Sequence, residues 1–186
     1  IRIPAWYCMA CGNIKINPEI KSNWFLVRHG ETDLNKEERF NHPETPLNEK
    51  GRAQAKEAAR QLEGKKIDLI ISSDFDRVKE TAEIIGKHLK IEIIFDKNLR
   101  EANGGSLHGL TEEETHERYL KTFPGMKKEE FHLLRYNFKH AGGEDWRDFE
   151  DRVWSAFKKH QTAHHHRNIA IITSGGVIRV IRKNLK

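Results

Sequence analysis

Arg28 and His29 directly follow an apolar run, in the sequence WFLVRHGE at residues 24–31. A buried strand that ends on a cation and an imidazole places a candidate nucleophile at the strand end. The glycine that follows, Gly30, lets the backbone approach the imidazole ring closely. A neutral imidazole nitrogen can attack phosphorus, and the phosphohistidine that forms divides one difficult displacement into two easier ones. Neighbouring arginines would bind phosphoryl oxygens and lower the pKa of the imidazole, which keeps the ring nucleophilic. Alone, the stretch is more typical of a structural histidine at a strand end; together with Arg77 and Glu101 at matching strand ends, it indicates phosphoryl chemistry on His29.

Polar residues also follow the three later apolar runs of the chain: Arg77 comes after 67–72, Glu101 and His108 come after 91–95, and Ser174 and Gly175 come after 168–173. Ligands of parallel sheets bind beyond the carboxyl ends of the strands, so we expect these side chains to converge at one edge. Two arginines and a glycine-rich helix start form an anion pocket that suits phosphate. Glu101 is the candidate proton donor to the leaving oxygen.

The segments that must position these residues alternate between two hydrophobic patterns. Short apolar runs predict strands at 23–28, 67–72, 91–95 and 168–173. Apolar stripes at helical spacing predict helices over 55–62 (opening near Asn48), over 78–89, over 146–157 and after Gly175. Segments 111–120 and 127–139 also have helical character and predict an insertion over the site. The alternation favours an α/β fold with three layers, α/β/α, and a mainly parallel central sheet with helices on both faces.

The composition agrees with one globular domain. The chain has 186 residues, of which 37% are hydrophobic and 33% are charged, enough for a sizeable core. No apolar run approaches the about 20 residues of a membrane span and no signal peptide is visible, so we expect a cytoplasmic protein with no membrane partner. The formal net charge of +5 favours anionic ligands, but the basic residues are spread out. A mild positive field serves phosphorylated small molecules as well as nucleic acid; we expect a small phosphorylated metabolite as the partner rather than nucleic acid.

Residues 1–22 show little periodicity and contain the two cysteines of the chain, Cys8 and Cys11, in the sequence YCMACGN. We expect an N-terminal appendage before a domain at 23–186. A Cys-x-x-Cys-Gly turn is typical of a zinc knuckle, but a closed zinc site needs four ligands and the sequence has no second cysteine pair. We therefore expect an incidental pair; completion of a zinc site by histidines or by a second subunit, as in a homodimer, is the alternative.

The chain ends ten residues after Gly176, so we also expect a domain shortened at its C-terminus.

The segment FLVRHGET, residues 25–32, resembles the signature of the histidine phosphatase superfamily, also called phosphoglycerate mutase-like, in its RHG-motif branch. The similarity continues in order through RF at 39–40, PLNEKGRAQA at 46–55, SSDFDRVKETA at 72–82, LREANGGSLHGLT at 99–111, GGE at 142–144 and SGGVIR at 174–179. RHGET alone is moderately specific, whereas the ordered set is highly specific. It covers nearly everything from Trp24 to Arg179.

The resemblance implies a role for each of these residues. His29 would carry a covalent phosphoryl group, which Arg28 and Arg77 would hold. Glu101 would donate the proton, and Asn35 would be a polar group of the pocket. No metal ion or organic cofactor is required.

One position departs from the family pattern. Relatives carry a second histidine before the Gly-Gly that follows the last strand, and this chain has Ser174 there. A serine hydroxyl donates one hydrogen bond but brings no positive charge, and losing such a donor typically costs about 3 kcal/mol, or about 10²–10³ in rate. The histidines at 164–166 precede the last strand, so about six strand residues place them roughly 20 Å away, at the opposite edge. His108 lies on the correct edge and is the better candidate for a substitute contact.

Three functions compete on this evidence. We expect a phosphatase that hydrolyses a phosphomonoester, with a small phosphorylated metabolite as substrate and a phosphorylated protein as the alternative. A phosphoglycerate mutase-type phosphotransferase is the second candidate, although the insertion at 121–140 has no adjacent arginine pair to clamp a second anionic group. A weakly active or inactive module that binds a phospholigand is the third, because Ser174 replaces the usual histidine.

Overall fold

A parallel sheet of four strands organises the chain. The structure is a computed structural model that describes residues 22–123, 137–165 and 167–185. Its strands are β1 (Asn23–Arg28), β2 (Leu69–Ser72), β3 (Ile93–Phe95) and β4 (Asn168–Thr173). They lie in the order β1-β4-β2-β3, and every pair is parallel. The parallel sheet predicted from the sequence is confirmed.

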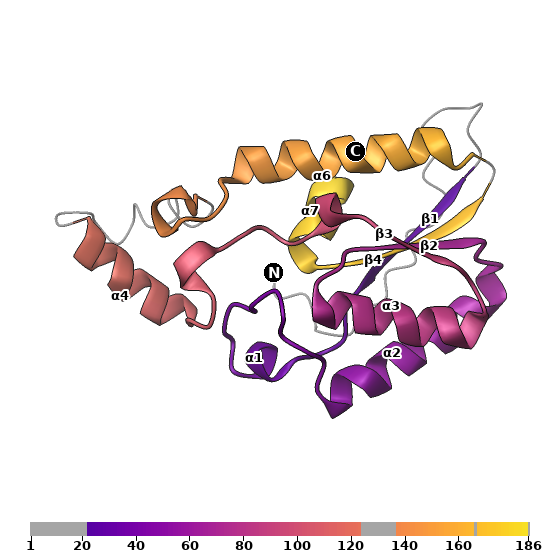
Figure 1. The fold of residues 1–186 in the computed structure, drawn as a ribbon, viewed down its shortest axis with the longest axis horizontal. Coiled ribbons are helices and arrows are strands. Elements are labelled where there is room, and N and C mark those ends of the chain that lie inside the picture. The colour runs from indigo at the N-terminus through magenta and orange to yellow at the C-terminus, as the bar shows by residue number, and fades with distance from the viewer. Residues whose placement is uncertain (1–21, 124–136, 166, 186) are drawn as a thin grey trace.

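Helices cover both faces of this sheet. The α-helices among the described residues are α1 (Asp33–Lys36), α2 (Glu49–Leu62), α3 (Asp76–Leu89), α4 (Glu112–Thr122), α6 (Trp146–Ala163) and α7 (Gly175–Asn184). Short 3₁₀ turns are η1 (Glu63–Lys65), η2 (Lys97–Leu99), η3 (Gly105–Leu107) and η5 (Lys139–Ala141). Helices α6 and α7 lie on one side of the sheet, and α2 and α3 lie on the other (Figure 1). The three-layer α/β/α fold is therefore confirmed.

Two hydrophobic cores follow from the alternation of side chains along the strands. Leu26 and Ile171 point toward α6 and α7, where Phe157 belongs to the same buried cluster. The next residues, Val27 and Ile172, point to the opposite face and pack with α2 and α3. Both faces of β1 and β4 are thus buried, which explains why their sequences are continuous apolar runs.

Two predicted strands are shorter in the structure than the sequence suggests. Strand β3 begins at Ile93 rather than at residue 91, because the N–H group of Ile91 donates to Gly86 O at 3.0 Å and still belongs to the end of α3. Strand β2 begins at Leu69 rather than at residue 67, since Lys66 turns the chain with a left-handed φ of 49°. The strands at 23–28 and 168–173 have the predicted bounds.

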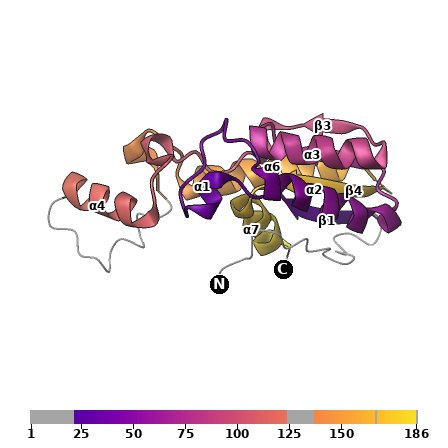
Figure 2. The same cartoon turned by 90° about the horizontal axis from the view of Figure 1, so that it is seen from below.

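The predicted insertion is described only in part. Helix α4 confirms the first segment, and it lies apart from the sheet in both views (Figures 1 and 2). Of the second segment, 127–136 lies outside the described residues, and 137–139 forms an isolated bridge and the start of η5 instead of an α-helix. No helix in the described part of the chain is long and apolar enough to cross a membrane.

Candidate active site

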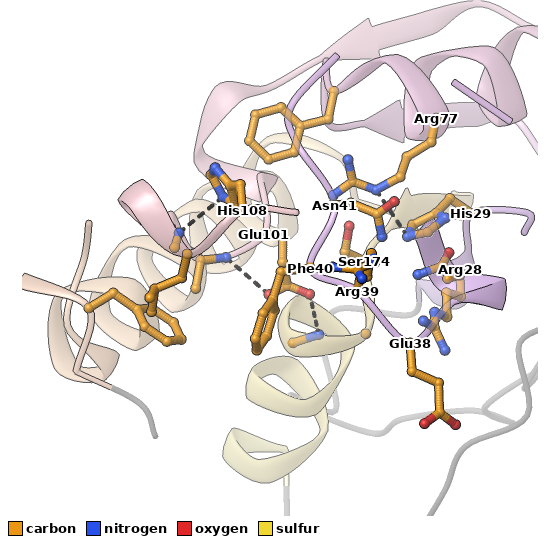
Figure 3. Close-up of a pocket in the computed structure, with 18 of the residues that line it drawn as sticks. Arg28, His29, Glu38, Arg39, Phe40, Asn41, Arg77, Glu101, His108 and Ser174 are labelled. Atoms are coloured by element: carbon orange, nitrogen blue, oxygen red, sulfur yellow. Dashed lines mark hydrogen bonds between the residues drawn. The ribbon is translucent and has the colours of Figure 1, made fainter. Parts of the chain in front are cut away.

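His29 lies directly beyond β1, where its backbone N–H group donates to Thr173 O of β4 at 3.0 Å. Only 3% of its surface is exposed. Nδ1 lies 2.7 Å from Gly30 O, and Nε2 lies 3.3 Å from Nε of Arg77. Because the carbonyl only accepts and the arginine only donates, these contacts assign the proton to Nδ1 and a lone pair to Nε2. The unprotonated nitrogen therefore lies beside a guanidinium group (Figure 3).

The surroundings of His29 also keep its ring neutral. Burial lowers its pKa well below the usual value, and the charges of Arg77 and Arg28 lower it further. The hydrogen bond to Gly30 O opposes this effect in part. The expected direction is therefore found, with desolvation as the largest single cause, ahead of the charge of Arg77 and then that of Arg28. A neutral imidazole is the form that can attack phosphorus.

Gly30 makes a different close contact from the one that the sequence suggests. A Cβ on this residue would lie 2.3 Å from Gly51 O in α2, so the close approach is to the start of that helix rather than to the imidazole ring. The N–H group of Gly30 donates to Thr81 Oγ1 in α3 at 3.2 Å. These two contacts fix the peptide whose carbonyl group holds Nδ1 of His29.

Arg77 enters the site as the second residue of α3. Its guanidinium carbon lies 5.3 Å from the ring centroid of Phe75, and Nη1 donates to His42 O at 2.8 Å. Burial lowers its pKa to about 10; Glu101 raises the value and Arg28 lowers it. The group stays protonated at neutral pH. Arg77 thus supplies a fixed positive charge at this point of the site.

Two buried polar atoms at the start of α7 have no hydrogen-bond partner among the described residues. One is Nε of Arg28 and the other is Oγ of Ser174. Ser174 precedes the first residue of α7 and makes no capping bond through its side chain. A Cβ on Gly175 would lie 3.8 Å from Nε of Arg28, and Arg28, Ser174 and Gly175 line the same pocket. Buried donors without partners are costly, and an anion at this helix start could accept from both of them.

Glu101 is fixed at the same end of α7. Oε2 accepts from the N–H group of Gly176 at 2.8 Å, and Oε1 accepts from that of Ala102 at 3.0 Å. A Cβ on Gly176 would lie only 2.0 Å from Oε1, so this carboxylate position requires glycine there. The charge of Glu101 raises the pKa of both Arg28 and Arg77, which places the carboxylate near both cations. Such a group can exchange a proton with a leaving oxygen.

A pocket of about 460 Å³ joins these groups (Figure 3). It is lined by each site residue that the sequence singles out within the described ranges, namely Arg28, His29, Asn35, Arg77, Glu101, His108, Ser174 and Gly175. Asn35 comes from α1, where its backbone N–H group donates to Thr32 Oγ1 at 3.0 Å. The structure therefore gathers residues from five separate segments around one cavity.

His108 lines the pocket, but its ring is already engaged. Nε2 accepts from the N–H group of Gly104 at 3.2 Å, and the ring centroid lies 5.6 Å from that of His42. Burial lowers the pKa of His108, and the charges of His42 and Arg77 lower it further. The ring is therefore neutral at neutral pH and adds no positive charge in place of the missing histidine. A direct contact between His108 and a phosphoryl group stays a prediction.

Several residues that line the pocket have no role in the sequence analysis: Arg39, Phe40, Phe138, Trp146 and Arg179. Arg179 lies one turn after Gly175 on α7, and its charge lowers the pKa of Arg28. The four-residue spacing from Gly175 could have identified it, since such residues share a helix face. Phe40 and Phe138 lie in loops, and no pattern in the sequence brings them together.

Metal binding has no support within the described ranges. No group of three or more His, Cys, Asp or Glu side chains among those residues could hold a metal ion. Cys8 and Cys11 lie outside the described residues, as does nearly all of the expected appendage at 1–22. The zinc knuckle and the boundary of the appendage therefore stay predictions.

Residues 24–186 match the family model of the histidine phosphatase superfamily (branch 1). "Phosphoglycerate mutase-like protein 4" of Arabidopsis thaliana is 34% identical over 161 residues, which make up 83% of this chain and 66% of that protein. "Probable phosphoglycerate mutase GpmB" of Escherichia coli is 46% identical over 96 residues, or 48% of this chain and 45% of that protein. The chain spans about half to two thirds of the length of these curated relatives.

Solved structures show the same fold. The protein YhfR of Bacillus stearothermophilus has a TM-score of 0.75 and 30% identity; the match covers 88% of this chain and 79% of that one. A mycobacterial glucosyl-3-phosphoglycerate phosphatase in complex with VO3 has a TM-score of 0.70 and 27% identity, over 86% of this chain and 78% of that one. The similar structures thus include a named phosphatase, and the curated relatives have mutase names.

Proposed function

Since this chain belongs to the histidine phosphatase superfamily, we propose that it hydrolyses a phosphomonoester through a phosphohistidine on His29. The observation that carries the proposal is the pair of contacts that assigns the His29 proton to Nδ1. They leave an electron pair on Nε2, beside Arg77 and within a pocket that Arg28 also lines. Guanidinium groups are well suited to bind phosphoryl oxygens.

In the first step, Nε2 of His29 attacks phosphorus as the bond from phosphorus to the ester oxygen breaks. The two arginines and the hydroxyl group of Ser174 donate to the nonbridging oxygens. The imidazole ring becomes positively charged when the N–P bond forms, and Gly30 O stabilises that charge through its bond with Nδ1. The leaving oxygen keeps the electron pair of the broken bond and takes a proton from Glu101, which therefore has to enter this step as the neutral carboxylic acid.

In the second step, water attacks the phosphorus atom of the phosphohistidine. The Glu101 carboxylate, which gave up its proton in the first step, accepts a proton from this water molecule. The N–P bond breaks, its electron pair returns to Nε2 of His29, and inorganic phosphate leaves. The cycle restores both side chains and needs no other reactant than water.

The proposed substrate is a small phosphorylated metabolite. A pocket of about 460 Å³ falls within the range that small-molecule sites usually have. A mutase would use the same phosphohistidine but transfer the phosphoryl group to a hydroxyl group instead of water. The names of the relatives include a phosphatase and a mutase, which supports the shared first step. Experiment decides whether water or a hydroxyl group then accepts the phosphoryl group.

The proposal is tested by trapping the phosphoenzyme. Incubation with labelled phosphomonoesters, followed by rapid denaturation, should give protein-bound phosphate that is labile in acid and stable in base. His29→Ala should abolish this label and the release of phosphate, whereas His88→Ala should keep both, because His88 is a surface residue paired with Glu63. Turnover in a folded His29→Ala protein would rule out the covalent mechanism. Phosphoglycerate isomerisation without phosphate release would instead identify a mutase.

A further inference from the structure

The pocket wall beside the charged groups is apolar and largely aromatic. It consists of Phe40, Phe75, Ala102, Leu107, Phe138 and Trp146. The rings of Phe40 and Phe138 meet edge to face, with centroids 6.5 Å apart. Phe138 and Leu107 are held by a buried cluster that includes Tyr119 of α4. Phe40 has 39% of its surface exposed, although it is large and apolar, so its ring is available to a ligand.

Arg39, the residue before Phe40, also lines the pocket, but carboxylates already neutralise its charge. Nη1 and Nη2 donate to the two carboxylate oxygens of Glu114 at 2.6 and 3.1 Å. Nη1 also donates to Gly109 O at 2.7 Å, and Nε donates to Glu37 at 3.2 Å. Four of its five N–H groups are thus used. A second anionic group of a substrate would find little positive charge here.

The positive charge of the pocket lining is concentrated in one part of the pocket. Arg179 is the remaining arginine of the lining, and it lies close enough to Arg28 to lower its pKa. Positive charge therefore gathers around the proposed phosphate position. The part beside Arg39 combines the rings of Phe40 and Phe138 with the ion pair between Arg39 and Glu114.

We infer that the site selects phosphate monoesters whose alcohol part is apolar, preferably ring-bearing, and carries no second negative charge. The inference rests on the proposed function, because it takes the phosphoryl group to lie at His29. A substrate carboxylate beside Phe40 and Phe138 would lose its hydration and gain no unpaired cation among the described residues. An aromatic ring in the same place would bury apolar surface and extend the edge-to-face contact.

The selection can be measured by binding, separately from turnover. Three phosphonates with the same anionic group serve as ligands in calorimetry: propylphosphonate, 3-phenylpropylphosphonate and 3-phosphonopropionate. The phenyl compound should bind about tenfold or more tightly than propylphosphonate, because it buries one additional ring. The carboxylate compound should bind no more tightly than propylphosphonate. Tighter binding of the carboxylate compound than of the phenyl compound would overturn the inference, even if phosphatase activity is found.

Two variants connect this preference to its residues. In Phe40→Ala, the ratio of the affinity for 3-phenylpropylphosphonate to that for propylphosphonate should fall by about threefold or more, because one wall of the ring site is lost. Glu114→Gln should strengthen binding of 3-phosphonopropionate several-fold, because it leaves Arg39 with one carboxylate fewer. Glutamine can still complete the capping box of α4, and Glu57→Gln, which changes an exposed pair with Arg60, is the matched control. The inference is overturned if Phe40→Ala leaves this affinity ratio unchanged and Glu114→Gln leaves the affinity for 3-phosphonopropionate unchanged. Failure of phosphate release with these binding preferences intact would reject the proposed hydrolysis instead.

Discussion

Nε of Arg77 donates to Nε2 of His29 at 3.3 Å, so the cation that is proposed to hold the phosphoryl group also covers the lone pair of the nucleophile. A phosphoryl oxygen carries negative charge and is a stronger acceptor for this N–H group than a neutral imidazole. We expect the arginine to transfer its hydrogen bond to the substrate when the phosphoryl group enters. Nε2 is then uncovered when phosphorus comes within reach, which couples binding to activation of the nucleophile.

The first prediction follows from this contact. Arg77→Ala should raise the dissociation constant of inorganic phosphate or vanadate about 10- to 100-fold, because a charged hydrogen bond contributes about 1.5–3 kcal/mol. Lys79→Ala is the control on the same helix, since Lys79 is half-exposed and lies 3.9 Å from Glu83. Calorimetric titration of both variants gives the comparison, with thermal melts to verify folding. Equal dissociation constants would contradict a phosphate position beside Arg77.

The second prediction concerns the pH dependence of turnover. The pKa of His29 is well below 6.5, so protonation of this ring should reduce kcat/KM only at a pH well below 6.5. Arg28→Gln removes one of the charges that lower this pKa, so the ring should gain its proton at a higher pH. The acid limb of the pH profile of kcat/KM should therefore move to higher pH, in addition to any loss of rate.

Arg60→Gln is the matched control for this shift, because Arg60 is exposed and paired with Glu57 on α2. Use of one substrate for all three proteins cancels the titration of the substrate itself. An acid limb of the Arg28→Gln variant that coincides with that of the wild type would show that the Arg28 charge does not act on the nucleophile.

The sequence predicted those parts of the fold that depend on continuous apolar runs. The strands at 23–28 and 168–173 are buried on both faces, and their bounds match the structure. Apolar character alone predicts a strand at residue 91, but its N–H group closes the end of α3. Competition between a helix end and a strand start depends on a single hydrogen bond, which hydrophobic periodicity does not encode.

The convergence of the polar pocket residues could be predicted, because they follow strands and parallel strands end at one edge. The apolar wall could not be predicted in this way. Phe40 and Phe138 are 98 positions apart in loops, and their rings meet where Phe138 belongs to a buried cluster that includes Tyr119 of α4. The sequence likewise gives no sign that the charge of Arg39 is neutralised, whereas the structure pairs it with Glu114.

The third prediction tests the position of Glu101. Gly176→Ala would place a Cβ 2.0 Å from Oε1 of Glu101 and must displace the carboxylate or the start of α7. Because a displacement of about 1 Å can cost about 10²-fold in rate, kcat should fall strongly. Gly64→Ala is the control, since a Cβ there meets no atom within 4 Å. Steady-state kinetics of both variants should show the loss only for Gly176→Ala. Unchanged kcat in that variant would remove Glu101 from the proton transfer.

The last prediction concerns Ser174, at which the chain departs from its family. Its Oγ is buried at the start of α7 and has no partner among the described residues, although Nε of Arg28 shares the same space. If this hydroxyl group donates to the phosphoryl group, Ser174→Ala should lower kcat/KM about tenfold or more, because a lost donor costs about 1–3 kcal/mol. Ser174→His should raise turnover by restoring a positive charge, provided that the ring fits beside Glu101.

The opposing hypothesis is that Ser174 marks the loss of catalysis, with ligand binding retained. In that case the wild-type rate is close to zero and neither substitution changes it, while the phosphate dissociation constant shifts only modestly. Kinetics and calorimetry on all three proteins, with 3-phenylpropyl phosphate as substrate and inorganic phosphate as ligand, separate the two hypotheses. Brisk wild-type turnover that Ser174→Ala leaves unchanged would contradict both, because the buried hydroxyl group would then have no part in holding the phosphoryl group.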